Sequence, residues 1–303
     1  MYKIVCLLFI ALSGANALFF NGTGKIGNAA TPAEGQFPFM ASLQQISLLG
    51  QPTRGHKCGG VLITLQHMLT AASCLFTYPE TGTPTLISAA NFRVFAGAVT
   101  LSNDADPNRI RQIANYTIHP EFMPYPAHRN DIAIVTLVTP FINSTNLRAL
   151  PLPNPTAVPQ EGTNCVTAGW GALDLLSNPL VPSQNLQFAE KYVYSQDLCT
   201  AYFSQQSHTP NVFSTMLCSA SHDVVSSGCP GDEGNPLVCN GVLSGIMIYH
   251  NICNGNSFPE LYTRVSNYTV WARSITGGAS TFQPGVLVLI FAAVQIVAAK
   301  FIY

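Results

Sequence analysis

Cysteine is the residue type whose number and spacing first suggest chemistry in this chain of 303 residues. Of the nine cysteines, Cys6 lies in an apolar N-terminal segment that is expected to be removed as a secretory signal. The eight that remain are an even number, which suits disulfide pairing in an oxidising compartment. The sequence has no Cys/His spacing typical of a zinc site, so we expect no metal ion and no cofactor. Spacing alone does not fix how these eight pair: Cys58, Cys74, Cys165, Cys199, Cys218, Cys229, Cys239 and Cys253.

The elements that must position these cysteines are short. Helical spacing occurs in residues 195–203 and 267–275. The Pro-rich segment 151–159 is the expected connector between two halves. Many short strands with turn signals, and no alternation of strands with long helices, predict an all-β barrel or sandwich. The apolar or alternating runs span residues 39–49, 60–72, 92–99, 110–119, 131–138, 165–169, 186–195, 236–249 and 261–265.

Several separate motifs follow one another in a fixed order along residues 26–276. They are Gly35-Gln36-Phe37-Pro38, Cys58-Gly59-Gly60, Thr70-Ala71-Ala72, Asp131-Ile132-Ala133, Gly169-Trp170-Gly171, Gly231-Asp232, Pro236-Leu237 and Tyr262-Thr263-Arg264-Val265. In this order they resemble the trypsin and chymotrypsin family of serine proteases. The resemblance implies an all-β fold of two antiparallel six-stranded β-barrels packed face to face around an active cleft, with a short C-terminal helix. It also implies the bridges Cys58–Cys74, Cys165–Cys239, Cys199–Cys218 and Cys229–Cys253.

Two positions depart from the catalytic triad that the resemblance implies. The family carries its histidine base in T-A-A-H-C, whereas this chain reads Thr70-Ala71-Ala72-Ser73-Cys74. The family nucleophile is the serine of G-D-S-G-G-P, whereas this chain reads Gly231-Asp232-Glu233-Gly234-Asn235-Pro236. The third member, the carboxylate that orients the imidazole, is present as Asp131. The triad-equivalent residues are therefore Ser73, Asp131 and Glu233, and the triad is not intact.

These replacements predict a pseudoenzyme without peptidase activity. A serine hydroxyl attacks an amide only when a neighbouring base removes its proton and carries it to the leaving amine. Ser73 cannot act as that base near neutral pH. Glu233 would place negative charge beside the oxyanion that the N–H groups of Gly231 and Glu233 would otherwise stabilise. The alternative is an active chymotrypsin-like serine endopeptidase. A separate hypothesis is a carboxylate pair of Asp131 and Glu233 that shares a proton and hydrolyses peptides only at acid pH.

The resemblance also implies an activation device. Lys25-Ile26 corresponds to the junction at which cleavage frees an amino group that pairs with the carboxylate of Asp232. Both partners are present, so the switch from precursor to ordered cleft is expected to operate, with a vestigial junction as the alternative.

The specificity pocket implied by the resemblance is altered. Ser227 would lie at its base, with Tyr249 and His250 along the substrate channel and His128 in the cleft wall. Glu260 falls where the family has a small glycine that opens the pocket. A glutamate there would either plug the pocket or offer a buried charge to a basic side chain, and we favour plugging.

Both ends of the chain are expected to lie outside the protease-like domain of residues 26–276. Residues 1–17 have the basic, apolar and small-residue parts of a secretory signal, and residues 18–25 would form a short propeptide-like segment. The apolar tail, residues 277–303, is similar to a GPI-attachment signal, with a short membrane helix or a mere extension as alternatives. Sequons predict N-glycosylation at Asn21, Asn115, Asn143 and Asn267.

Composition limits the kinds of partner. With 13 basic and 14 acidic side chains the formal net charge is -1, so a basic nucleic-acid-binding chain is excluded, and 48% hydrophobic residues exclude disorder. We expect an extracellular protein, secreted or anchored at the cell surface, that acts as a monomer. Its expected partner is a protein, namely a protease, a protease inhibitor or a substrate of a protease cascade.

Overall fold

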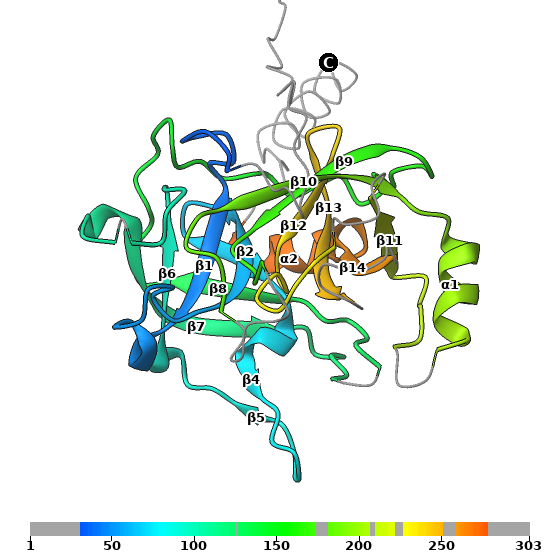
Figure 1. Ribbon diagram of the computed structural model, residues 1–303, viewed down its shortest axis with the longest axis horizontal. Coiled ribbons are helices and arrows are strands. Elements are labelled where there is room, and N and C mark those ends of the chain that lie inside the picture. Colours follow the sequence, from blue (N-terminus) through cyan, green and yellow to red (C-terminus); the bar gives the residue numbers. More distant parts are fainter. Residues whose placement is uncertain are drawn as a thin grey trace, which may run out of the picture.

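In the computed structural model, the chain folds into two main sets of strands (Figure 1). The structure describes residues 31–277 except residues 103, 125–126, 174–180, 207–209, 222–226 and 251–258. The predicted signal peptide and propeptide-like segment, and the tail beyond residue 277, lie outside the described residues. The same is true of four predicted site residues, Asn21, Lys25, Ile26 and Cys253.

The first set of strands closes into an antiparallel barrel in the order β1-β2-β3-β8-β7-β6. Aliphatic and aromatic side chains that suit a pleated surface fill it, and Leu43, Val61 and Phe95 are fully buried. The strands are β1 (Met40–Gln45), β2 (His56–Thr64), β3 (His67–Thr70), β6 (Phe92–Ala96), β7 (Ile110–Ile118) and β8 (Ala133–Leu137).

The second set closes into another antiparallel barrel in the order β10-β11-β14-β13-β12-β9. The chain between β8 and this barrel contains the Pro-rich segment 151–159, as expected of a connector. The strands are β9 (Asn164–Gly169), β10 (Gln187–Val193), β11 (Met216–Ala220), β12 (Pro236–Cys239), β13 (Val242–Tyr249) and β14 (Glu260–Arg264).

Contacts between the barrels fix the cleft that separates them. Trp170 is fully buried after β9, and its Nε1–H donates to the carbonyl of Val99 at 2.9 Å. The backbone N–H of Leu186 donates to the same carbonyl at 2.8 Å. Because a buried indole N–H needs an acceptor, this contact holds the second barrel against the loop that follows β6.

The remaining elements lie at the edges. A two-stranded hairpin, β4 (Phe76–Thr77) and β5 (Thr85–Leu86), extends away from the first barrel (Figure 1). The helices are α1 (Gln196–Ser204) and the C-terminal α2 (Thr269–Thr276). Short 3-10 helices occur at Ile46–Leu48, Ala72–Leu75, Ala89–Asn91, Pro107–Arg109 and Val265–Tyr268. The predicted fold of two six-stranded barrels with a short C-terminal helix is therefore confirmed.

Disulfides join segments that are distant in sequence. The described residues contain the bridges Cys58–Cys74, Cys165–Cys239 and Cys199–Cys218, which are three of the pairings implied by the family resemblance. The fourth implied bridge, Cys229–Cys253, involves a residue outside the described part. Cys58–Cys74 ties β2 to the segment that carries Ser73, and so fixes one wall of the cleft.

Candidate functional site

Asp131 is held rigidly where the two barrels meet. Its side chain is fully buried, and Oδ1 accepts the backbone N–H of Ser73 at 2.8 Å. The hydroxyl of Thr263, in the second barrel, donates to the Asp131 carbonyl at 2.7 Å. Tyr268, at the start of α2, donates its hydroxyl to Oδ1 of the preceding Asn130 at 2.7 Å. Both barrels therefore position this carboxylate, and Ser73 lies beside it.

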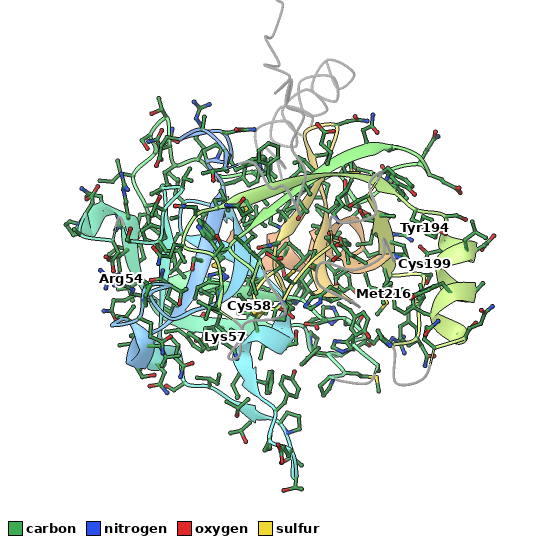
Figure 2. The ribbon with its side chains drawn as sticks, in the orientation of Figure 1. Arg54, Lys57, Cys58, Tyr194, Cys199 and Met216 are labelled. Atoms are coloured by element: carbon green, nitrogen blue, oxygen red, sulfur yellow. A yellow bond between two sulfur atoms is a disulfide. The ribbon has the colours of Figure 1, made fainter. Side chains whose placement is uncertain are left out.

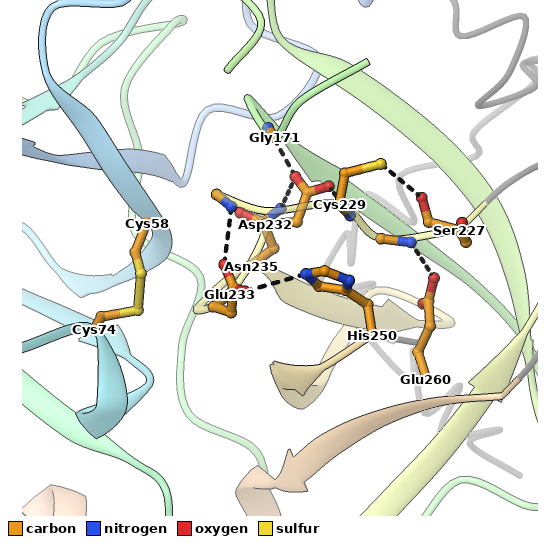
Figure 3. Close-up of polar contacts among 12 residues, drawn as sticks. Cys58, Cys74, Gly171, Ser227, Cys229, Asp232, Glu233, Asn235, His250 and Glu260 are labelled. Carbon is orange, nitrogen blue, oxygen red and sulfur yellow. Dashed lines mark hydrogen bonds and ion pairs between the residues drawn. A yellow bond between two sulfur atoms is a disulfide. The ribbon is translucent and has the colours of Figure 1, made fainter. Parts of the chain in front are cut away.

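Glu233 lies in the loop before β12, and both of its carboxylate oxygens are engaged (Figure 3). The backbone N–H of Gly231 donates to Oε2 at 2.9 Å, and Nε2 of His250 contacts Oε1 at 3.1 Å. Gly231 has a φ of 98°, a conformation that glycine adopts without strain. The structure thus brings the predicted oxyanion-hole residues together, but the Gly231 N–H is bound by the chain's own carboxylate.

The protonation of Glu233 and His250 follows from their contact. Burial alone would raise the pKa of Glu233, but the hydrogen bond and charge of His250, together with the Gly231 N–H, outweigh it and lower this pKa. Burial alone would lower the pKa of His250, but the hydrogen bond and charge of Glu233, with weaker attraction from Asp232 and Glu260, raise it. The two side chains therefore favour the charged pair.

We expect this pair to make stability depend on pH. The ordinary pKa values are 6.5 for histidine and 4.5 for glutamate. Because the folded pKa of His250 is raised, its contribution is fully present below about 6.5 and is lost as pH rises through the folded value. Because the folded pKa of Glu233 is lowered, the contribution of Glu233 to stability is present above about pH 4.5 and is lost as pH falls through the folded pKa. Urea unfolding should show His250→Gln less stable than the wild type at pH 5.5, with the difference shrinking towards pH 9. A difference that grows with pH would contradict the charged pair.

His128 contacts the other carboxylate of the cleft. Its Nδ1 lies 3.4 Å from Oδ2 of Asp131, and its side chain is mostly buried. The residue has a φ of 47°, in the left-handed region. Each carboxylate thus has a histidine of its own, an arrangement that the hypothesis of a proton-sharing pair of Asp131 and Glu233 did not include.

A cavity of about 510 Å³ lies in the cleft. It brings together the predicted residues Ser73, Glu233, Tyr249 and His250, and the wall residue His128. Phe76 and Tyr78 extend its wall at the root of the β4–β5 hairpin. The remaining lining residues are Lys57, Cys58, Cys74 and Ile248. A cavity of this size and mixed lining suits a small ligand or part of a peptide.

Glu260 does not line this cavity but is buried in β14 beside Lys191 of β10. Lys191 Nζ lies 2.7 Å from Oε1, and the Tyr262 hydroxyl donates to Oε2 at 2.7 Å. The backbone N–H of Gly228 also donates to Oε1, the contact of Glu260 that is drawn in Figure 3. Glu260 was expected either to plug the pocket while reaching water or to offer its charge to a ligand. Neither expectation included Lys191 as its partner within the protein. Lys191 alternates with the buried Ala189 and Val193, and that period-two spacing was the signal for an inward-facing lysine.

Ser227, the predicted pocket base, is buried on the segment leading to Cys229. The neighbouring Asp232 accepts the backbone N–H groups of Gly171 and Cys229, each at 2.9 Å, and the side-chain amide of Asn235 at 2.8 Å. Burial raises the pKa of Asp232 to about 6, although these N–H donors oppose the shift. The predicted partner of Asp232, Ile26, lies outside the described residues.

No sequence motif pointed to His56, which supports the same loop from the first barrel. Its Nε2 lies 2.9 Å from the Gly231 carbonyl, and its Nδ1 lies 2.7 Å from the Ser42 hydroxyl. Burial lowers the pKa of His56 to about 4, although the hydrogen bond to Gly231 opposes the shift. The neutral ring therefore donates from Nε2 to the carbonyl and accepts the serine hydroxyl at Nδ1.

Three predicted glycosylation sites, Asn115, Asn143 and Asn267, are exposed, which leaves each open to modification. Within the described residues, no helix has the length and apolar character needed to span a membrane. In that same part of the chain, no group of three or more His, Cys, Asp or Glu side chains is arranged to hold a metal ion.

Comparison with known proteins agrees with this architecture. Human granzyme M is 31% identical over 275 residues, which cover 89% of this chain and 96% of granzyme M. The structure of neuropsin, a serine protease of mouse brain, is similar with a TM-score of 0.65 and 25% identity, and covers 82% of this chain and 98% of neuropsin. A mutant of human heparin binding protein gives the same TM-score and identity, covering 82% of this chain and 96% of its own. The family model for trypsin matches residues 26–272, and the chain therefore belongs to the trypsin family.

Proposed function

We propose that the chain is a non-catalytic serine protease homologue that acts as an extracellular binding or regulatory protein in proteolysis. The observation that carries the proposal is the 2.9 Å hydrogen bond from the Gly231 N–H to the Glu233 carboxylate. In the family this N–H would stabilise the oxyanion of the reaction, but here it is already bound to a negative charge. The base position is occupied by Ser73, which cannot carry a proton from a nucleophile to a leaving amine.

Binding in place of catalysis is consistent with the setting of the cleft. The disulfides fit an oxidising, extracellular location. One similar structure is named a heparin binding protein, and this name indicates that a protein with this fold can have a binding role. We propose a protease, a protease inhibitor or a cascade substrate as the partner of this chain, because preformed clefts of this kind present a surface complementary to such proteins. A monomer, tethered to the membrane through its tail, is part of the same proposal.

We expect the purified protein to cleave no peptide bond above background. Turnover of a mixed peptide library would be measured from acid to neutral pH, before and after cleavage at Lys25. An Asp131→Ala, Glu233→Ala variant prepared in parallel serves as the control for contaminating protease. Equal background in both proteins supports the proposal. Turnover that disappears in the variant would overturn it and favour the active chymotrypsin-like endopeptidase.

A further inference from the structure

The cleft cavity has a cation that the proposed binding function does not yet explain. Lys57, on β2 next to Cys58, lines the cavity near the root of the β4–β5 hairpin (Figure 2). Among the described residues it forms no ion pair. Burial lowers the pKa of Lys57, and the charge of Glu233 opposes this only in part. An ammonium group that is partly withdrawn from water without a close partner would be stabilised by an anion in the cavity.

His250 lines the same cavity and brings a second positive charge to it. Its Nε2 contacts Glu233 at 3.1 Å, whereas its Nδ1 is buried without a hydrogen-bond partner in the described part of the chain. The contact with Glu233 favours the charged imidazolium, in which both ring nitrogens carry hydrogen. The positive charge of His250 offsets the negative charge of Glu233, so Lys57 still attracts an anion although Glu233 also lines the cavity.

The other charges of the cavity limit the anion to a single negative charge. Glu233 also lines the cavity, but its two oxygens are occupied by the Gly231 N–H and by His250. A dianion such as phosphate would be repelled by this carboxylate and left with too few donors. One carboxylate, facing Lys57, matches the charges of the cavity.

The rest of the lining is aromatic. Phe76 and Tyr249 both line the cavity, and other rings support them at centroid distances of 5.7 Å for Phe76 with Phe122 and 5.8 Å for Tyr249 with Phe203. Tyr78, which is 45% exposed, borders the open side. Rings held in this way present fixed faces and edges to an aromatic or apolar group.

We propose that the cavity binds a carboxylate that is carried next to an aromatic or apolar group, with the carboxylate held by Lys57 and attracted by the charge of His250. This inference rests on the proposed function as a binding protein and deepens it by naming the class of ligand. An acidic side chain and a C-terminal carboxylate both offer this chemistry, and the test separates them.

The probes are three small molecules titrated into the whole protein by calorimetry. N-acetylphenylalanine carries a terminal carboxylate, N-acetylphenylalaninamide is its neutral match, and an acetylated, amide-capped Glu-Phe dipeptide carries a side-chain carboxylate. We expect at least one acid to bind at least about tenfold more tightly than the amide, because charge-assisted hydrogen bonds are the stronger ones. The acid that binds more tightly shows whether the site takes a C-terminal carboxylate or a side-chain carboxylate. Equal affinity of both acids and the amide would overturn the proposal.

Substitutions at Lys57 test whether this side chain binds the carboxylate. Lys57→Met keeps the apolar stem of the side chain and should abolish the preference for the acid, whereas Lys57→Arg should retain it. Arg109→Met removes a partly buried cation that does not line the cavity, and it should change nothing. An acid preference that survives Lys57→Met would overturn the assignment. The comparison of acid with amide on the unmodified protein stands even if a variant fails to fold.

Failure of this inference and failure of the proposed function give different results. A protein that cleaves peptides yet prefers the acid would overturn the non-catalytic function and leave the carboxylate site standing. An inactive protein without the preference would overturn the carboxylate site alone.

Discussion

Ser73→His combined with Glu233→Ser is expected to give a protein that hydrolyses an activated ester at least about 10³-fold faster than either single variant. Asp131 is already buried and held by both barrels, so an imidazole at position 73 would find its orienting carboxylate in place. Serine at position 233 would supply a nucleophile and release the Gly231 N–H for an oxyanion. Triad residues act as a unit, so each single variant should stay near background. The measurement is the initial rate of ester hydrolysis after cleavage at Lys25.

The control for this gain is a third variant that also carries Asp131→Ala, which should return the rate to background. Circular dichroism and melting temperature would show that all variants are folded. A folded double variant without activity would contradict the prediction. In that case other residues of the cleft would prevent catalysis, such as His250 or the His128 ring that already contacts Asp131.

Lys191→Met is expected to produce the largest loss of stability, with a melting temperature about 10 °C below that of the wild type. The substitution leaves the Glu260 carboxylate buried without its cation, and breaking a buried pair in this way costs about 3–5 kcal/mol in the free energy of unfolding. For a domain of this size, each kcal/mol corresponds to about 2–4 °C. Thermal unfolding followed by circular dichroism is the measurement.

Two further variants show whether the charge is responsible. Glu260→Gln in the Lys191→Met background removes the orphaned charge and should restore most of the melting temperature, since neutral replacements for buried pairs are often tolerated. Arg109→Met removes one partner of a partly exposed ion pair with Asp106 and should shift the melting temperature by at most about 2 °C. If the double variant is no more stable than Lys191→Met, the loss comes from packing and not from charge.

Much of the fold could be predicted because motif order and turn residues are local signals. The apolar runs at 60–72 and 236–249 each contain residues of two strands that are joined by a tight turn. The second turn, at Asn240-Gly241, carries the residue pair that favours such a hairpin, whereas the first, at Leu65-Gln66, carries no turn residue. The sequence analysis missed β11, since every residue of Met216–Ala220 is buried and no polar alternation marks it.

The candidate site was predictable in its members but not in its contacts. Motif spacing pointed to Ser73, Asp131 and Glu233, and the structure places them around one cleft. The pairing of Glu233 with His250 joins the loop before β12 to the residue that follows β13, and the pairing of Glu260 with Lys191 joins β14 to β10. Only the closure of the second barrel decides which side chains meet inside it, and no local pattern carries that information.

The loop around Gly231 has a consequence for the kinetics of recognition. Its N–H is bound by Glu233 and its carbonyl by His56, so the loop is ordered before any partner arrives. A surface that is already ordered loses little conformational entropy on association. Partners that differ in affinity should therefore meet this cleft at similar association rates, and the residence time of each complex should distinguish them.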